Sequence, residues 1–564
     1  MADIDYKKAV EDKKSNPVYA RMDEDRKLVE LSQYTLTDAS DQHKDVPNAI
    51  SITLNDPAVF AANVEASLGN ATEQVVVESE DKNLDTAYIE DFIRAALLSA
   101  SQRLTKQGRF PLTPFFDQQV CRRGRAAARC LFRIDKDGVL IPDIVPWDTR
   151  YMYYGMDDEG MAWAAYETTR DKEAINSRYK EANVTEEEST VLDIWSRTHN
   201  EVWVGENKKV EDRKHDKGCV PVCFQMVPMG SMTADKDSLV HQGESIFFLI
   251  RDLIPELNRL VSIIQSLNQK ALDNAMLWKT AEGTGGTPPK YRDLTSPGAV
   301  TSADIGGGVE TVNYGEIKRS AYLLHSMIET RIQRGSVSNL DLGIMGNQPW
   351  SAVSLIEIGE GRDQVFLPRL GTRGLLNEQL ADMQLEQVIN SGATTVEIGT
   401  RGHKRSFDVR KLQGEYEVKF KYFIKSPKID IARFSMAAAA GNLIPDKAKR
   451  RDILQREDPE EDERQLRWEE AERLSPAIKM NRTIKGLLEM AKRGDKDAEF
   501  EAELMSAEMG MNLKQLLAGE VGQQPKPEEA EKPKPMVPMF GGPSGSARKA
   551  AELEATPRAE GGGE

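Results

Sequence analysis

The sequence has little cysteine for its length, with four residues among 564: Cys121, Cys130, Cys219 and Cys223. So few cysteines exclude a fold that depends on a disulfide framework. Cys219 and Cys223 have a spacing that two zinc ligands could have. However, no second Cys/His pair with ligand spacing follows them, which disfavours a metal site. We therefore expect reduced, buried thiols and no bound metal.

Long apolar runs are also missing. The densest, Ile246 to Ile250, is far shorter than the ~20 residues of a membrane-spanning helix. The first thirty residues are charged and contain no apolar segment of the kind found in secretory signals. The 39% hydrophobic and 29% charged residues are typical of a globular protein. We expect a protein that is made and kept in the cytosol, with room for roughly three to four domains.

Motifs of enzymatic chemistry are absent from the sequence. It contains no GxxxxGK[ST] phosphate loop, no HExxH and no GxSxG, and its six histidines are scattered singly. The Gly-rich segment at Gly283 lacks the Lys-Ser/Thr ending of a phosphate loop. Acidic residues are so numerous that pairs of carboxylates arise by chance, and they do not indicate a nuclease. The sequence thus predicts no catalytic residue and no cofactor.

Positive charge is in deficit, because 75 Lys and Arg face 91 Asp and Glu, which gives a net charge of −16 and a pI near 5.2. A protein that binds nucleic acid over its whole surface is normally basic. The negative net charge therefore disfavours tight, general DNA binding. It is compatible with an acidic surface that repels phosphate and lets DNA slide past. The densest basic run, Cys121 to Arg129 (CRRGRAAAR), fits a phosphate-contacting patch or, with better support, the solvated face of a helix.

The middle of the chain carries a long amphipathic pattern. From Ile246 to Ala271 apolar residues recur in alternating steps of four and three, which is typical of a helix with one apolar face. Pro255 interrupts this pattern. Because the apolar residues keep their phase across the proline, we predict one helix that bends near Leu253 and continues.

A second helical pattern returns from Glu316 to Gln333, and Gly335 is its expected end. A Gly/Pro-rich excursion separates the two patterns. Two long helices joined by a small module suggest an antiparallel pair that carries the module away from the body. An ordinary helical hairpin inside a core fits the same pattern equally well.

The remaining segments predict an α+β body. We expect strands over residues 50–54, 131–134, 139–144, 163–168, 191–196, 201–204, 394–398, 407–409 and 415–424. We expect helices that begin at Asp56-Pro57 and at Asp85, a helix over residues 113–128, and a very long helix from Ser351 to near Gly392 that bends at Gly359, Gly361 and Pro368. Further helices follow Asp430, one of them beginning at Pro459 and ending near Leu474.

This order of elements resembles the portal proteins of tailed double-stranded DNA bacteriophages. Specific similarities are Pro146-Trp147-Asp148 after a hairpin, Gly243-Glu244-Ser245 before the first long helix, and Ala432-Arg433 with Gly441-Leu443-Ile444-Pro445 in the C-terminal helices. The resemblance covers residues 45–480 and rests more on the order of elements than on invariant motifs. It implies a mixed α/β wing, long antiparallel stem helices, a small clip module and a helical crown.

With this resemblance the chain divides into an N-terminal arm (1–35), a wing (36–240), a first stem helix (241–278), a clip (279–314), a second stem helix (315–337), a tunnel loop (338–352), a long bent helix with wing strands (353–427), a crown (428–520) and a disordered tail (521–564). Residues 1–40 are highly charged with little periodicity, which fits an arm or surface helices. This segment and the tail match no part of the family. The tail is too poor in apolar residues to fold.

Portal proteins form rings, usually of twelve subunits, at one capsid vertex of the virion, after assembly in the host cytoplasm. Double-stranded DNA passes non-specifically through the ring during packaging and ejection. The resemblance implies as partners the terminase large subunit, head-completion and tail adaptor proteins, and capsid and scaffolding proteins. Twelve copies of this chain would carry a formal charge of about −190, which suits a passage that must not retain DNA.

The resemblance also suggests site residues. Candidates for phosphate contacts in the channel are Lys318, Arg319, Arg331 and Arg334, for which salt bridges between subunits are an equally supported role. In the tunnel loop Asn347, Gln348 and Trp350 could touch the duplex backbone. In the clip, the candidates for binding the motor or an adaptor are Lys290, Tyr291 and Arg292. The alternative is that these three are ordinary loop residues without a binding role.

Two other classes of function compete with a channel. One is a nucleic-acid-processing enzyme of the packaging machinery, a nuclease or an ATPase subunit, against which the missing phosphate loop and catalytic motifs speak. The other is a scaffold that oligomerises through its helices without forming a channel.

Overall fold

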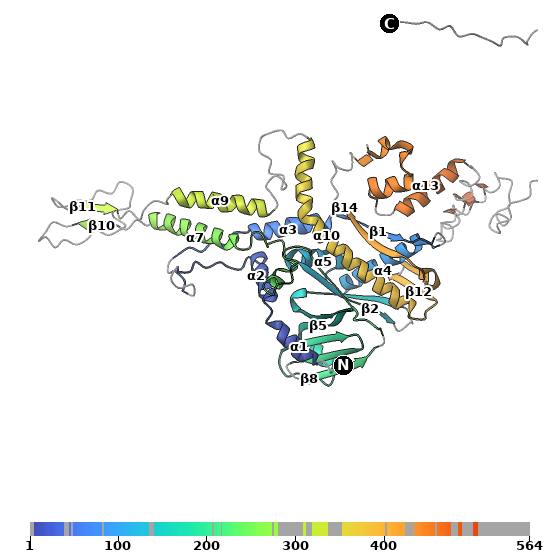
Figure 1. The fold of residues 1–564 in the computed structure, drawn as a ribbon, viewed down its shortest axis with the longest axis horizontal. Coiled ribbons are helices and arrows are strands. Elements are labelled where there is room, and N and C mark those ends of the chain that lie inside the picture. Colours follow the sequence, from blue (N-terminus) through green and yellow to red (C-terminus); the bar gives the residue numbers. More distant parts are fainter. Residues whose placement is uncertain are drawn as a thin grey trace, which may run out of the picture. The chain divides into compact units, whose positions relative to one another are not determined.

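The computed structural model describes residues 5–38, 44–46, 49–81, 84–134, 140–205, 208–215, 217–272, 276–279, 308–311, 319–336, 352–400, 403–423, 433–434, 436–456, 459–474 and a few between 483 and 505. The chain forms two compact units, Met1–Glu463 and Arg464–Glu564. The first unit mixes helices and sheets, as the sequence predicted. Figure 1 shows its elements.

The largest sheet is a five-stranded antiparallel meander in the order β4-β5-β6-β7-β8. Its strands are β4 (Met152–Asp157), β5 (Gly160–Asp171), β6 (Glu188–Ser196), β7 (His199–Val204) and β8 (Lys208–Lys214). The sequence predicted β5, β6 and β7. The two outer strands were not predicted. Strand β8 is polar and largely exposed, whereas β4 begins with the buried residues Met152 and Tyr153. A short helix, α6 (Lys172–Arg178), lies between β5 and β6.

Two N-terminal helices, α1 (Tyr6–Lys14) and α2 (Pro17–Val29), pack on this meander. Val10, Tyr19 and Met22 are buried there with Trp163 of β5. The Tyr19 hydroxyl donates a hydrogen bond to the Met152 carbonyl at 2.8 Å. The segment expected as an arm therefore contains helices that belong to the core of the first unit.

A three-stranded sheet has the order β3-β2-β9, with β2 (Arg125–Ile134) between β3 (Leu140–Trp147) and β9 (Val222–Met226). The predicted hairpin of β2 and β3 is confirmed. The helix predicted over residues 113–128 is wrong at its end, because α5 (Leu112–Arg122) stops before Gly124, whose φ is +68°. A Cβ at Gly124 would lie 2.2 Å from the Gly243 carbonyl oxygen, so only glycine permits this turn.

The long helix α10 (Ala352–Ile389) crosses the body over β2, β9 and β14. It has 38 residues, and Pro368 lies inside it. Figure 1 shows that its first turns run at a steep angle to the rest, as expected where a proline removes a backbone donor. Its start, its bend and its end before Gly392 agree with the sequence prediction.

A long-range pairing joins the two ends of the body. Strand β1 (Thr72–Glu78) pairs in antiparallel fashion with β14 (Glu417–Phe423), while β12 (Thr395–Thr400) and β13 (His403–Asp408) form a hairpin. The sequence predicted β12, β13 and β14 but missed β1. Helices α3 (Asp56–Gly69) and α4 (Thr86–Lys106) begin where the sequence predicted, and the Asp85 side chain caps α4.

Charged side chains are buried beneath α10. Arg373 forms an ion pair with Asp117 of α5, and both side chains are less than 5% exposed. The Arg373 guanidinium also lies over the ring of Tyr422 of β14, 4.3 Å from its centroid. The Tyr422 hydroxyl donates to Glu73 of β1 at 3.0 Å. One chain of polar contacts therefore ties α5, α10, β14 and β1 together.

The C-terminal helices are described in part. Gly441–Leu443 form a 3-10 turn (η4), followed by α12 (Asp446–Ala448), a π-helical turn η5 (Lys449–Ile453) and α13 (Pro459–Leu474). The predicted start of a helix at Pro459 and its end at Leu474 are confirmed. The predicted disordered tail, residues 521–564, lies outside the described residues.

We predict that Asp117→Ala destabilises the protein by about 3–5 kcal/mol, because it leaves the Arg373 guanidinium buried without its counter-charge. Urea unfolding followed by circular dichroism measures the loss. The matched control is Asp157→Ala, whose ion pair with Arg197 lies on the surface and whose loss should leave the unfolding midpoint unchanged. Equal midpoints for Asp117→Ala and the wild type would contradict the prediction.

Candidate assembly site

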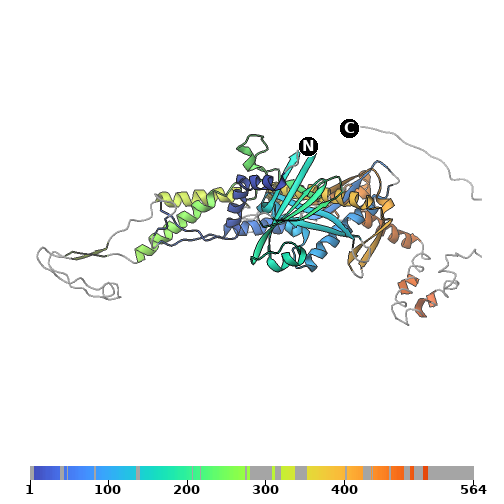
Figure 2. The same cartoon turned by 90° about the horizontal axis from the view of Figure 1, so that it is seen from below.

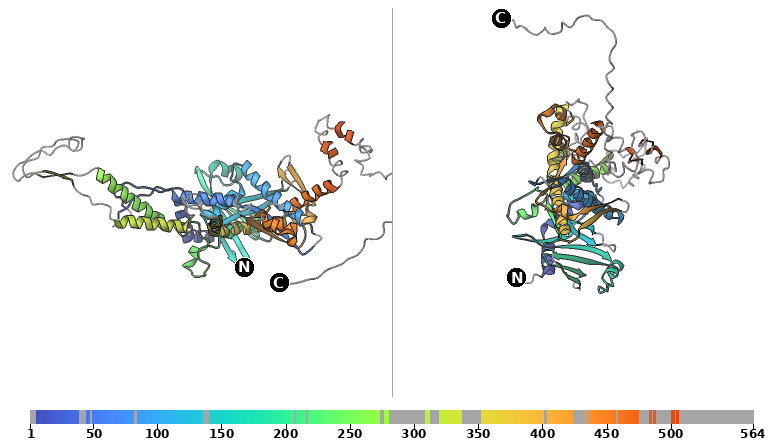
Figure 3. Two further views of the ribbon diagram at one scale, coloured as in Figure 1. Left: turned by 90° about the horizontal axis from the view of Figure 1, so that it is seen from above. Right: turned by 90° about the vertical axis from the view of Figure 1, so that its right-hand side faces the viewer.

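Two helices form an antiparallel pair: α7 (Leu253–Leu272) and α9 (Arg319–Gly335). Figure 1, Figure 2 and Figure 3 agree that they lie side by side. Ile254 and Leu257 of α7 pack against Ile328 and Ile332 of α9. The predicted return of a second helix, ending at Gly335, is confirmed.

The start of the first helix corrects the sequence prediction. The amphipathic pattern begins at Ile246, but residues 246–252 form successive turns and α7 begins only at Leu253. Pro255 therefore lies in the first helical turn, where its missing N–H breaks no hydrogen bond. Ile246 and Phe247 are buried in the core of the body instead of extending a rod.

The C-terminal end of α9, at Gly335, lies against the turns at residues 246–252. A Cβ at Gly335 would lie 2.7 Å from a methyl carbon of Ile250, so the two segments approach more closely than any larger residue allows. Beyond the other end of the pair, β10 (Met276–Lys279) and β11 (Gly308–Thr311) are paired antiparallel. The two strands thus keep the helices connected as a hairpin. The rest of the predicted clip lies outside the described residues.

An extended segment is held along α7 by side chains. The backbone N–H groups of Leu54, Ile52 and Ile50 donate to Asn258, Ser262 and Ser266 at 3.0, 2.9 and 2.9 Å. Four helical residues rise about 6 Å and two extended residues about 6.6 Å, so the two spacings match. The strand predicted over residues 50–54 is wrong, because this segment pairs with a helix and not with a sheet.

Apolar side chains remain uncovered on the helix pair. Four of them on α9 are between 48% and 61% exposed, and we call them the α9 apolar face: Tyr322, Leu323, Leu324 and Met327. On α7 the predicted apolar positions Leu260, Ile264 and Leu267 are only half-buried. The buried side of α7 is instead the one that carries the Asn258, Ser262 and Ser266 ladder. Exposed apolar surface of this kind is common at contacts between protein chains.

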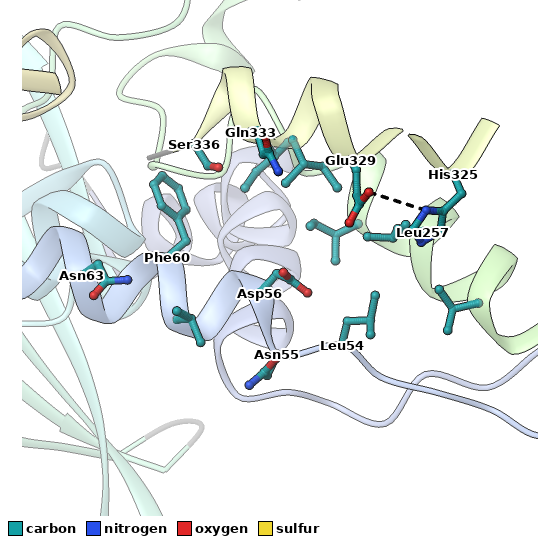
Figure 4. Close-up of a pocket in the computed structure, with 15 residues that line it drawn as sticks. Leu54, Asn55, Asp56, Phe60, Asn63, Leu257, His325, Glu329, Gln333 and Ser336 are labelled. Carbon is teal, nitrogen blue, oxygen red and sulfur yellow. Dashed lines mark ion pairs between the residues drawn. The ribbon is translucent and has the colours of Figure 1, made fainter. Parts of the chain in front are cut away.

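A groove of about 630 Å³ lies where α3, α7 and α9 meet. Figure 4 shows Phe60 and Leu257 on its apolar walls and Asp56, His325 and Glu329 at its polar edge. The only interaction drawn between its lining residues is the His325–Glu329 ion pair at 3.7 Å. With this lining the groove can accept an apolar side chain from another molecule.

A buried ionic cluster anchors the base of α7. The Glu244 carboxylate is fully buried and accepts hydrogen bonds from Arg251 at 2.7 Å and His241 at 2.9 Å, with Arg21 at 3.2 Å. Arg251 also donates to Asp25 of α2 at 2.7 Å. Burial is the strongest single influence on Glu244 and opposes its ionisation. The hydrogen bonds from Arg251 and His241, together with the positive charges of Arg21 and Arg251, outweigh burial and hold the pKa of Glu244 below the usual value. Burial in turn lowers the pKa of Arg21 to about 10.

The basic run at residues 121–129 is not the solvated face of a helix, because α5 ends at Arg122 and the side chains of Arg123, Arg125 and Arg129 are buried. Its arginines bind groups of the protein: Arg122 pairs with Glu65, Arg123 donates to the Met22 carbonyl and to Asp148, Arg125 donates to the Gln242 carbonyl, and Arg129 pairs with Asp143 and Asp193. These contacts connect α5 and β2 to α2, α3 and the segment before α7. The run is basic because this junction needs buried donors.

The channel candidates are placed in part. Arg331 and Arg334 are exposed on α9, and they form no ion pair with any residue that the structure describes. Arg319 is the first residue of α9. Outside the described residues lie Lys318, Asn347, Gln348 and Trp350, and the clip candidates Lys290, Tyr291 and Arg292.

The cysteines are free thiols, with Cys121, Cys130 and Cys223 buried and Cys219 half-buried. Burial raises the pKa of the Cys219 thiol. Over the described part of the chain, no group of three His, Cys, Asp or Glu residues has the geometry of a metal site. None of the described helices combines the length and the apolar character needed to cross a membrane.

No family model matches the sequence, and neither does any curated protein. Several solved structures match, and three of them each cover 70% of this chain and 88% of the other. They are the neck of an empty gene transfer agent particle computed with C6 symmetry (12% identity, TM-score 0.39), the virion of a native gene transfer agent particle (11%, 0.37) and the neck of a native particle computed with C12 symmetry (12%, 0.35). TM-scores of this size do not establish a shared fold or function.

The Glu244 cluster predicts a pH dependence of stability. Because its folded pKa lies below the ordinary value of 4.5, Glu244 contributes its full stabilisation above about pH 4.5, and this is lost as the pH falls through the folded pKa. We expect Glu244→Gln to lower the free energy of unfolding by about 3 kcal/mol at pH 7, and by much less near pH 3. Urea titrations between pH 3 and pH 7 measure the difference.

The control is Glu397→Gln, which removes a half-exposed carboxylate paired with Lys404 on β13. It should shift the unfolding midpoint little at either pH. A Glu244→Gln effect that is equal at pH 3 and pH 7 would contradict the assignment of a depressed pKa to this carboxylate.

Proposed function

We propose that this protein is a portal-type subunit, which forms a ring with identical copies around a channel for double-stranded DNA in a phage-like particle. The observation that carries the proposal is the α9 apolar face, which lies on a long helix pair and is not covered by any part of the chain that the structure describes. Leu324 and Met327, three residues apart on α9, are 48% and 61% exposed. Covering such a face removes apolar surface from water and therefore favours association.

A ring of identical copies provides that cover. When a surface of one copy binds a different surface of the next, the contact is heterologous, and it closes into a ring if the rotation between copies closes. The groove between α3, α7 and α9 is a candidate receptor for apolar side chains of a neighbouring α9. The α9 apolar face and the groove lie on the same part of each copy. The apolar face of one copy can therefore bind in the groove of the next copy, all around the ring.

Charge supports a passage for DNA. The net charge of −16 makes a ring of many copies strongly acidic, which limits the retention of a polyanion. Arg331 and Arg334 are positive groups exposed on α9, and in this proposal they contact phosphates without reading sequence. The clip, including Lys290, Tyr291 and Arg292, would bind the terminase large subunit and later the adaptor proteins.

The first test is ring assembly. We predict that the double variant Leu324→Glu, Met327→Glu remains folded but fails to form rings, because each contact would bury two carboxylates against apolar side chains. Negative-stain images of the wild type should show closed rings with an axial hole. Light scattering should give a monomer mass for the variant, with an unchanged melting temperature.

The matched control is Leu98→Glu on α4, since Leu98 is 59% exposed and lies away from the helix pair. This variant should form rings like the wild type. Rings formed by the Leu324/Met327 variant, or a wild type that stays monomeric at high concentration, would overturn the proposal. A scaffold without a channel would give oligomers with no axial hole.

A second test concerns Arg331 and Arg334. We predict that replacing both with Gln leaves rings intact and lowers the dependence of DNA binding on salt, because each lost phosphate contact reduces the slope of log K against log salt by about one. Filter binding of linear duplex DNA at several salt concentrations measures this slope for the wild type and the variant. Rings that dissociate in this variant would instead assign both arginines to salt bridges between subunits.

The alternative is a packaging enzyme. ATP hydrolysis, or DNA cleavage that depends on a divalent metal, by the pure wild-type protein would favour it over a channel subunit.

A further inference from the structure

A second cavity, of about 550 Å³, lies between the three-stranded sheet, β5 and the segment that joins α4 to α5. It is lined by arginines from several elements and by two carboxylates: Arg103, Arg109, Arg129, Arg133, Arg170 and Arg178, with Asp143 and Asp193. Six guanidinium groups therefore face two carboxylates. The cavity is far more basic than the acidic chain that contains it.

The internal ion pairs do not balance this charge. Asp143 is buried and pairs with Arg103, Arg129 and Arg133 at once. Asp193 pairs with Arg129 at 3.2 Å. The three remaining arginines, Arg109, Arg170 and Arg178, form no ion pair with a residue that the structure describes. Arg109 and Arg178 are exposed, and Arg170 donates to the Thr168 hydroxyl at 3.1 Å, so all three positive charges are accessible to a ligand in the cavity.

The deepest arginine has a free donor. Arg129 is only 8% exposed, and its two terminal nitrogens contact Asp143 and Asp193. Its Nε, however, has no hydrogen-bond partner within the described chain. This N–H is open to an acceptor from outside the chain, as is the Nε of Arg103 in the same cavity.

Aromatic rings form another wall of the cavity. Trp147 and Tyr166 are stacked with centroids 4.9 Å apart and planes 5° apart. Phe115 lines the same cavity, and Phe110 is 74% exposed at its edge. Trp147 is only 1% exposed and is stacked on Tyr166, so the rings that a ligand can reach are those of Phe110 and the half-buried Phe115. A ligand with both a planar ring and an anionic group would match these phenylalanines and the arginines.

We propose that this cavity binds a phosphate-bearing ligand of nucleotide size, with its phosphates on the arginines and its ring on the aromatic wall. Guanidinium groups bind phosphate through paired N–H donors, and 550 Å³ is within the range of small-ligand sites. A nucleotide or the end of a nucleic acid strand has this chemistry. This inference does not depend on ring formation, because every lining residue belongs to one copy of the chain.

Calorimetry on the full chain tests it with three probes: tripolyphosphate, ATP and adenosine. We expect binding of tripolyphosphate and tighter binding of ATP, with adenosine much weaker than either. A 5′-phosphorylated dinucleotide is then compared with ATP to tell a strand end from a free nucleotide. Tighter binding of the dinucleotide would identify the ligand as a strand end, and tighter binding of ATP would identify it as a free nucleotide. Either result supports a phosphate site in this cavity.

Two variants locate the binding. Arg170→Gln and Arg178→Gln should each weaken ATP binding about tenfold without changing the melting temperature, because neither arginine has an ion-pair partner to lose among the described residues. Arg410→Gln removes an exposed arginine outside the cavity, and it should bind ATP like the wild type. Wild-type protein that binds none of the phosphate probes at millimolar concentration would overturn the proposal. So would full affinity in both variants, or a preference for an acidic peptide over tripolyphosphate.

Discussion

The buried carboxylate of Glu244 is the contact on which the arrangement of this protein depends. It lies within hydrogen-bond reach of Arg21 of α2, His241 and Arg251 at once, and Arg251 continues to Asp25. These residues belong to the N-terminal helices and to the turns before α7. A fully buried charge is tolerated only with such partners, so the cluster permits one position for the base of α7.

The position of that base determines what the helix pair can do. The pair has a small core of its own, made by Ile254, Leu257, Ile328 and Ile332, and one side of α7 is held by the extended segment at residues 50–54. Within the described part of the chain, the α9 apolar face is left uncovered. The proposal of a ring of copies rests on this combination of a helix pair fixed at its base and exposed apolar side chains along its length.

Arginine has two distinct roles in this acidic chain. In the run at residues 121–129 and in Arg373 it supplies donors to buried carbonyls and carboxylates, and thereby joins elements that are far apart in sequence. In the cavity beside Trp147 it is present in excess over the acidic groups. Arg129 belongs to both sets, because it ends the basic run and also lines the cavity. A count of charges along the sequence does not separate these roles.

The sequence by itself determined the elements whose periodicity is local. The apolar spacing of α7, α9 and α10, the proline and glycine signals at Pro459 and Gly335, and the alternation in β5, β6 and β7 depend on neighbours within a few residues. Only the tertiary structure decided which distant groups meet. Residues 50–54 are extended as predicted, yet they bind a helix, because Asn258, Ser262 and Ser266 match their spacing. Likewise β1 pairs with a strand more than 300 residues away, and Gly124 ends α5 early because a distant backbone lies against it. Such pairings depend on three-dimensional fit, which no local pattern encodes.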